Sequence, residues 1–154
     1  MSQDVGDRLP DFSLPTNGGG NLTAASLSGN KIVLYFYPKD DTSGCTKEAQ
    51  AFRDMADAFA ATGTAVIGVS RDSVASHDKF KAKHALTFPL VSDEDGDLCN
   101  ALGVWVQKSM YGKSYMGIER TTFLVDESGV IRRVWRKVKV PGHAAEVLAA
   151  AQAL

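Results

Sequence analysis

Lys31–Arg53 reads KIVLYFYPKDDTSGCTKEAQAFR, and this stretch decides the fold. Its first part, Lys31–Tyr37, is an almost unbroken run of Val, Ile, Leu, Phe and Tyr, which predicts a strand covered on both faces. Pro38 lacks a backbone donor and is expected to end that strand. After Gly44, apolar residues recur at spacings of three and four, which indicates a helix. The residues of this pattern are Ala49, Phe52, Ala56 and Phe59.

Cys45 lies where the polar loop meets the predicted helix N-terminus. The first helical turn presents unpaired N–H groups and a partial positive charge, so a thiolate is favoured there over the neutral thiol. Its position therefore predicts a reactive cysteine. Free cysteine is also among the most buried residue types, so Cys45 as an inert core residue is an equally open interpretation at this point.

The composition indicates an ordinary globular chain. It has 154 residues, 44% hydrophobic and 23% charged, with a net charge of −1, and we expect a single domain over residues 1–154. This charge gives no reason to expect nucleic acid or a membrane surface as a partner. No export signal or membrane-spanning run is visible, so we expect a cytoplasmic protein. The two cysteines and three histidines lack ligand spacing, and we expect no metal and no cofactor.

The remaining segments predict alternating strands and helices. Residues 1–30 indicate a turn-rich lead-in with a hairpin turn at Gly18–Asn21, and Gly63 is expected to follow the end of the first helix. The predicted order is β-α-β-α-β-α-β-β-α, an α/β fold with a central mixed sheet flanked by helices. The later elements expected are strand Thr64–Ser70, helix Val74–His84 capped by Asp72 or Ser73, strand Phe88–Val91, a helix from Asp93, strands Thr121–Val125 and Val130–Val138, and helix His143–Leu154.

Pro38–Glu48, PKDDTSGCTKE, resembles the peroxidatic-cysteine motif of the peroxiredoxins. More narrowly, it is similar to the subgroup called bacterioferritin comigratory protein, or PrxQ. The resemblance covers nearly the whole chain and implies a thioredoxin-like fold and a thiol-dependent peroxidase acting on hydrogen peroxide and organic hydroperoxides. The other matching segments are VGDRLPDFSLP, IVLYFYP, FPLVSDEDG, GVW and YMGIERTTFLVDESGVI.

The resemblance implies a role for each of five residues. Cys45 would attack the hydroperoxide as a thiolate and become a sulfenic acid. Thr42 would hydrogen-bond the thiolate and the peroxide, and Pro38 would shield the sulfur from water. Arg120 would hold thiolate and peroxide oxygens, and Glu48 would orient this arginine. Without the resemblance, Thr42 is equally a helix N-cap, Arg120 a solvated flanking residue, and Glu48 a favourable charge in the first turn.

The chain departs from the subgroup where a second, resolving cysteine is usual. Those two positions hold Gln50 and Lys81, so we expect a one-cysteine enzyme reduced by an external thioredoxin, glutaredoxin or small thiol. Cys99 lies among apolar residues and is expected to be a packed thiol, with a resolving role as the alternative. The subgroup also implies a monomer.

Two other functions remain open from the sequence. A thioredoxin-fold redox sensor or thiol-binding module with little turnover would explain the missing resolving cysteine. A cysteine hydrolase would need a histidine base near Cys45, and no histidine lies close in the sequence. Trp105, Tyr111 and Tyr115 are near Arg120 in the sequence and could wall a substrate pocket, but we expect them to be ordinary packing aromatics.

Overall fold

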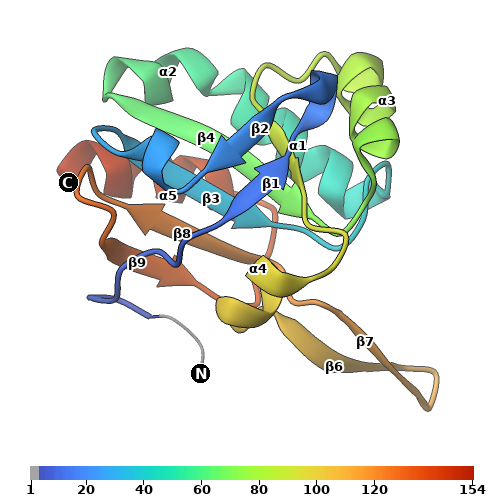
Figure 1. Cartoon of the computed structure of the whole chain (residues 1–154). Coiled ribbons are helices and arrows are strands. Elements are labelled where there is room, and N and C mark those ends of the chain that lie inside the picture. Colours follow the sequence, from blue (N-terminus) through green and yellow to red (C-terminus); the bar gives the residue numbers. More distant parts are fainter. Residues whose placement is uncertain (1–3) are drawn as a thin grey trace.

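A five-stranded sheet forms the centre of the molecule (Figure 1). The computed structural model describes residues 4–154, so residues 1–3 of the expected lead-in and of the expected 1–154 domain lie outside it. The strand order is β5-β4-β3-β8-β9, in which β3, β4 and β5 are parallel and β8 and β9 are antiparallel to their neighbours. This confirms the predicted α/β fold with a mixed sheet. The strands are β3 (Lys31–Phe36), β4 (Thr64–Ser70), β5 (Leu90–Ser92), β8 (Thr121–Val125) and β9 (Ile131–Trp135).

Both faces of this sheet are covered, which explains the unbroken apolar run of β3. Val33 and Tyr35 point into the core under helices α1 (Ser43–Asp54), α2 (Ala56–Ala61), α3 (Val74–His84) and α5 (His143–Ala153). Their neighbours Ile32, Leu34 and Phe36 point into a second core on the other face. That face carries α4 (Asp97–Ala101), the hairpin β1 (Ser13–Pro15) and β2 (Asn21–Thr23), and the short 3-10 helix η2 (Ala25–Leu27) (Figure 1). A second 3-10 helix, η1 (Asn17–Gly19), joins β1 to β2 and contacts α3.

The predicted helices differ from the observed ones in two places. The helix after Gly44 was expected to run to Gly63, but it breaks at Met55 (φ −104°, ψ 9°) into α1 and α2. The helix expected from Asp93 begins at Asp97, because the Asp93 carboxylate instead accepts from the backbone N–H of Cys99 at 2.8 Å. The predicted helix Val74–His84 is confirmed, with Ser73 Oγ accepting from the Ser76 N–H as its N-cap.

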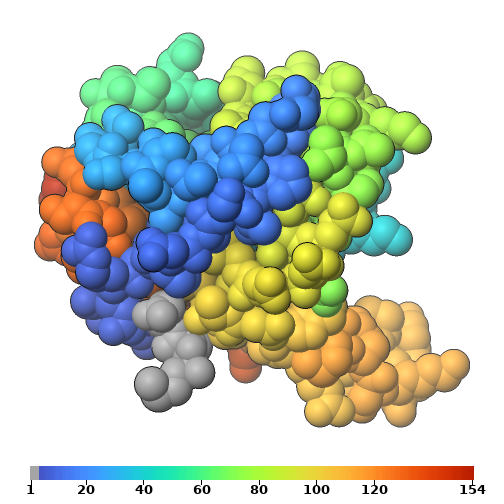
Figure 2. Space-filling view, in the orientation of Figure 1, coloured from blue at the N-terminus to red at the C-terminus, as the bar shows by residue number. Residues whose placement is uncertain are grey.

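One hairpin was absent from the prediction. Strands β6 (Trp105–Met110) and β7 (Lys113–Ile118) pair antiparallel and project from the body of the molecule (Figures 1 and 2). Tyr111 and Gly112 form the two-residue turn, both with positive φ (53° and 76°), as a type I′ hairpin turn requires. Polar and charged residues interrupt the apolar ones in both strands, and most positions are half-buried or exposed, so the continuous apolar run by which the other strands were recognised is missing.

The N-terminal segment runs along both edges of the central sheet. Near β9, the N–H of Gly6 donates to the carbonyl of Ile131, and the N–H of Ile131 donates to the carbonyl of Asp7, both at 2.8 Å. At the opposite edge, Thr16 forms an isolated antiparallel bridge with Val91 of β5. In residues 4–154, no helix has the length and apolar character needed to cross a membrane.

Candidate active site

Cys45 lies in the first turn of α1, as its sequence position predicted. Thr42 is the N-cap residue, with extended backbone (φ −93°, ψ 156°), and its carbonyl accepts from the Thr46 N–H at 2.8 Å. The Cys45 side chain is 2% exposed and belongs to the core beneath the helices. The sulfur is therefore both buried and placed at the positive end of the α1 dipole.

Arg120 joins Cys45 and Glu48 directly. Its Nη2 donates to Cys45 Sγ at 3.3 Å, and its Nη1 donates to Glu48 Oε1 at 2.6 Å. Glu48 lies one helical turn after Cys45, so both side chains can meet the same guanidinium. Arg120 directly precedes β8, in which Thr121 pairs with Phe36, and this pairing places the arginine beside the end of β3 where the cysteine loop begins.

The charges of this cluster are mutually dependent. Burial raises the pKa of Glu48 to about 7, although the neighbouring Arg120 charge acts in the opposite direction. Burial disfavours the Arg120 cation, but Glu48 and Cys45 outweigh it and raise the pKa of Arg120. Glu48 Oε2 has no hydrogen-bond partner among the described residues, which is one reason that its ionised form is costly. A permanent cation beside a buried sulfur stabilises the thiolate form of that sulfur.

The Thr42 hydroxyl lies differently from its expected position. It donates to the Lys39 carbonyl at 2.8 Å and makes no side-chain cap bond, so neither the expected bond to the thiolate nor an N-cap role for the hydroxyl is observed. Because its proton is used by Lys39, the Thr42 oxygen is left as an acceptor. A bond from the peroxide to Thr42 stays a prediction.

A depression of about 440 Å³ lies between the cysteine loop and the β6–β7 hairpin. Its lining includes Pro38, which is half buried, and side chains of Trp105, Lys108, Tyr115 and Met116. Trp105 packs against the second core, as expected, and also lines this depression. Tyr115 lines it too but is 44% exposed, so the expectation of ordinary packing is wrong for Tyr115. Tyr111, also expected to pack, is 96% exposed at the hairpin tip.

Lys108 and Met116 were not found from the sequence, because the hairpin that presents them was not predicted. Partial burial and the Arg120 charge lower the pKa of Lys108, whereas Cys45 and Glu119 raise it. The Lys108 amine therefore interacts electrostatically with both Arg120 and Cys45. The tyrosine-glycine pair Tyr111-Gly112 between two six-residue segments was the only local sign of this hairpin.

Known proteins resemble this chain over most of its length. The sequence profile of the AhpC/TSA family matches residues 5–134. The chain belongs to this family and is a peroxiredoxin. Peroxiredoxin Bcp of Bacillus subtilis is 48% identical over 148 residues, 96% of this chain and 94% of the relative. Peroxiredoxin Bcp of Escherichia coli is 41% identical over 139 residues, 90% of this chain and 89% of the relative.

Solved peroxiredoxin structures also have this fold. Xanthomonas campestris peroxiredoxin Q has a TM-score of 0.89 at 50% identity, over 92% of this chain and 90% of that chain. A cysteine-to-serine mutant of Xylella fastidiosa PrxQ has a TM-score of 0.94 at 44% identity, over 99% of this chain and 98% of that chain. The thioredoxin-like fold and the PrxQ resemblance are thereby confirmed, and the protein is a thiol-dependent peroxidase that uses a hydroperoxide and a thiol reductant.

Cys99 of this peroxiredoxin lies on the other side of the central sheet from Cys45. It is fully buried in the core on the opposite face of the sheet from Cys45, and both cysteines are free thiols. Burial, and then the Asp93 carboxylate, raise the pKa of the Cys99 thiol strongly. A packed thiol was predicted here and is observed.

The three histidines of the peroxiredoxin make their hydrogen bonds away from Cys45. His77 contacts Asp40 and Val91, His84 contacts Asp41, and His143 Nε2 lies 2.8 Å from Thr122 Oγ1. None is placed as a base for the thiol, so the cysteine hydrolase alternative gains no support from the described residues.

Proposed function

We propose that Cys45 is the peroxidatic cysteine of this thiol-dependent peroxidase. Its thiolate attacks the terminal oxygen of a hydroperoxide, so that an S–O bond forms and the O–O bond breaks. The leaving alkoxide, or hydroxide from hydrogen peroxide, takes up a proton, and Cys45 becomes a sulfenic acid. The observation that carries this proposal is the Arg120 fork, which contacts Cys45 Sγ and Glu48 Oε1 together.

The four other residues assist this step in distinct ways. Arg120 stabilises the thiolate and the oxygens that gain charge in the transition state, and Glu48 fixes the plane of the guanidinium. Thr42 accepts a hydrogen bond from the peroxide O–H and orients the attacked oxygen. Pro38 lines the depression at the start of the cysteine loop. Its proposed role is to shield the sulfur from water.

We further propose a one-cysteine mechanism with an external reductant. A thioredoxin, glutaredoxin or small thiol attacks the sulfenic acid to give a mixed disulfide and water, and a second thiol then releases Cys45 and a disulfide. The burial of Cys99 behind the sheet supports this route, as do Gln50 and Lys81 at the usual resolving positions. We expect the chain to act as a monomeric single domain in the cytoplasm.

Hydrogen peroxide and alkyl hydroperoxides are the proposed substrates. The depression beside Pro38 offers apolar side chains to an alkyl group, chiefly Trp105, Tyr115 and Met116. Structures of the Xanthomonas campestris bacterioferritin comigratory protein were described for alkyl peroxide reduction, and that protein is 49% identical with a TM-score of 0.89.

Intact mass spectrometry with a dimedone trap tests the proposal. After one equivalent of hydrogen peroxide, we expect one dimedone adduct on Cys45 in the wild type and in Cys99→Ser, and none in Cys45→Ser. An adduct retained in Cys45→Ser would overturn the assignment. Loss of two hydrogens in the wild type, with an adduct restored in Cys99→Ser, would instead make Cys99 the resolving cysteine.

Steady-state peroxide turnover distinguishes a redox sensor from a peroxidase. A sensor would form the Cys45 adduct and yet consume little peroxide at steady state with thioredoxin, glutaredoxin or glutathione. We expect sustained consumption with at least one of these reductants.

A further inference from the structure

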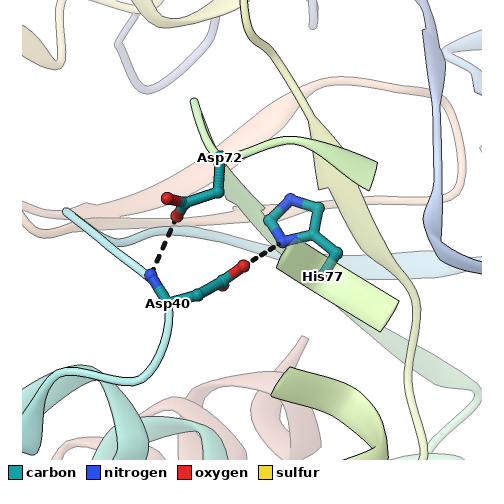
Figure 3. A group of neighbouring side chains, drawn as sticks. All are labelled: Asp40, Asp72 and His77. Atoms are coloured by element: carbon teal, nitrogen blue, oxygen red, sulfur yellow. Dashed lines mark hydrogen bonds and ion pairs between the residues drawn. The ribbon is translucent and has the colours of Figure 1, made fainter. Parts of the chain in front are cut away.

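A buried polar cluster lies behind the loop that carries Cys45. It consists of Asp40 from that loop, Asp72 from the turn after β4, and His77 from the first half of α3 (Figure 3). The His77 side chain is fully buried, and that of Asp40 is 3% exposed. His77 Nδ1 lies 2.7 Å from Asp40 Oδ2, and the Asp40 N–H donates to Asp72 Oδ2 at 2.8 Å.

The partners of the imidazole decide how many protons it carries. Nε2 lies 2.9 Å from the Val91 carbonyl, which can only accept, so Nε2 must carry a hydrogen. On the other side, the Asp40 carboxylate also accepts from the Tyr37 hydroxyl at 2.5 Å and the Ser76 hydroxyl at 2.8 Å. A carboxylate with this many donors is ionised, so Nδ1 carries a hydrogen as well. His77 is then an imidazolium.

The surrounding charges agree with this assignment. Burial favours the neutral ring, but Asp40, the Val91 carbonyl and Asp72 outweigh it and raise the pKa of His77. The other titratable group that faces the ring is the phenol of Tyr37, directly after β3, whose pKa is raised by burial and which therefore stays neutral. A ring with hydrogen on both nitrogens has no lone pair for a metal, so this cluster is an ion pair and not a cation site.

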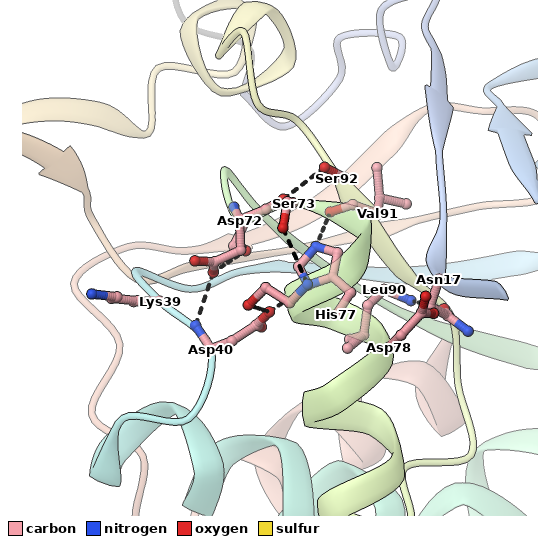
Figure 4. Close-up of polar contacts among 12 residues, drawn as sticks. Asn17, Lys39, Asp40, Asp72, Ser73, His77, Asp78, Leu90, Val91 and Ser92 are labelled. Carbon is pink, nitrogen blue, oxygen red and sulfur yellow. Dashed lines mark hydrogen bonds and ion pairs between the residues drawn. The ribbon is translucent and has the colours of Figure 1, made fainter. Parts of the chain in front are cut away.

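The His77–Asp40 ion pair anchors the cysteine loop next to a residue with a strained backbone conformation. Asp41, directly after Asp40, has φ 60°, in the left-handed region that non-glycine residues seldom adopt. The next residue, Thr42, is the N-cap of α1, and Cys45 follows within the first turn. Asp72 is itself held by two serines. The Ser92 hydroxyl donates to the Asp72 carbonyl at 2.6 Å (Figure 4), and Ser70 Oγ donates to Asp72 Oδ2 at 2.7 Å.

We propose that His77 and Asp40 are positioning residues of the peroxidase: a buried imidazolium–carboxylate pair that fixes the 38–44 loop and, through it, Thr42 and Cys45. This rests on the proposed role of Cys45. Neither residue touches the sulfur, and their effect on the reaction is to hold the helix start where Arg120 can reach it. A displacement of about 1 Å at a reacting group can cost on the order of a hundredfold in rate.

The first test needs no variant. In the wild-type protein labelled with ¹⁵N-histidine, NMR reports whether each ring nitrogen of His77 carries hydrogen. At about pH 7, where most free imidazole is neutral, we expect hydrogen on both Nδ1 and Nε2 of His77. A single protonated nitrogen at that pH would overturn the proposal.

The second test compares two replacements of His77 by the rate at which hydrogen peroxide oxidises Cys45. Asn keeps a donor near the Nδ1 position, whereas Leu fills similar space without one. We expect His77→Leu to be slower by about tenfold or more and His77→Asn to stay within about threefold of the wild type. If His77 only fills space, Leu would be the better replacement, and that order would overturn the proposal.

His84→Asn is the matched control. His84 also lies on α3 and also contacts the cysteine loop, through Asp41 at 3.1 Å, but Asp41 is half exposed and keeps Lys83 as a second partner. An exposed pair of this kind contributes little, so the rate is expected to stay within about twofold. Two outcomes distinguish the positioning role from the proposed function. If Cys45 of the wild type is not oxidised at all, the proposed function fails. If Cys45 of His77→Leu is oxidised at the normal rate, only the positioning role is refuted.

Discussion

The charge of the buried Glu48 carboxylate affects the reactivity of Cys45 through Arg120, although Glu48 does not touch the sulfur. It accepts from Arg120 through one oxygen, while the other oxygen has no partner among residues 4–154. Arg120 in turn reaches the sulfur with its second nitrogen. Protonation of Glu48 therefore removes the charge that orients the guanidinium, and the effect is transmitted to Cys45.

The pH dependence of peroxide reduction should report this residue. Burial raises the pKa of Glu48 to about 7, so the carboxylate is ionised above that pH and neutral below it. We expect the second-order rate constant with hydrogen peroxide to fall as the pH drops through about 7. In Glu48→Gln this inflection should be absent, and the rate at about pH 8 should be roughly tenfold lower because a hydrogen bond to a charged group is lost. An unchanged inflection in Glu48→Gln would contradict the assignment.

At the scale of elements, the β6–β7 hairpin is where substrate preference should be set. Tyr115 and Met116 line the depression and are 44% and 50% exposed, so an alkyl group can bury part of each side chain. Replacing both by Ser removes apolar contact with an alkyl hydroperoxide and leaves the Cys45–Arg120 pair intact.

We expect Tyr115→Ser/Met116→Ser to react with cumene hydroperoxide about tenfold more slowly, which corresponds to about 1.4 kcal/mol of lost contact. The rate with hydrogen peroxide should stay within about twofold, since that substrate has no alkyl group to bury. Met110→Ser is the control, because Met110 is 56% exposed on the same hairpin and does not line the depression. Equal losses with both peroxides would argue against a specificity role; stopped-flow kinetics gives both rates.

The elements differ in how far they could be predicted. The central strands and α3 were recognisable because burial on both faces of a sheet requires continuous apolar runs and because Ser73 gives a local cap. The delayed start of α4 was not, since the Asp93 carboxylate accepts from backbone N–H groups further along. The break at Met55 was not either, because no Gly or Pro marks it in the sequence. The β6–β7 hairpin was not predicted because its partly exposed strands mix polar and apolar residues and contain no continuous apolar run.

The candidate active site was also predictable only where local sequence determines which residues meet. Cys45 and Glu48 are one helical turn apart, so their proximity follows from local structure. Arg120 joins them only through the pairing of β8 with β3, and its role was inferred from the family resemblance rather than from local pattern. His77 carried no local signal, because its partner Asp40 lies 37 positions away and a histidine within a helix otherwise suggests nothing.

At the scale of the whole molecule, buried histidines make stability depend on pH. His143, which packs against Phe52 and Trp135, is buried, and burial lowers its pKa from 6.5 to about 4. Because the folded pKa is depressed, the unfolded chain takes up this proton first. The stability that His143 contributes is therefore present above about 6.5 and is lost as the pH falls toward about 4.

Glu48 has a raised pKa in the folded protein, so its contribution to stability changes with pH in the opposite direction to that of His143. The effect of His143 is therefore measured as the difference in unfolding free energy between the wild type and a His143 variant. We expect His143→Gln to gain stability relative to the wild type as the pH falls from about 6.5 to about 4, by up to about 3 kcal/mol. Urea unfolding at several pH values measures this difference, from which the Glu48 contribution cancels. A constant difference between the two proteins across that range would rule out the assignment.

The N-terminal segment has a consequence for how copies of this protein behave when crowded. Exposed edge strands offer unpaired N–H and C=O groups on which another chain can add a strand, and this is how sheets grow into aggregates. Here Gly6 and Asp7 already hydrogen-bond β9 at Ile131, and Thr16 bridges β5 at Val91. Another chain could add a strand only after this segment had dissociated from the sheet edges. The hydrogen bonds of the segment therefore protect the protein against amyloid-like aggregation.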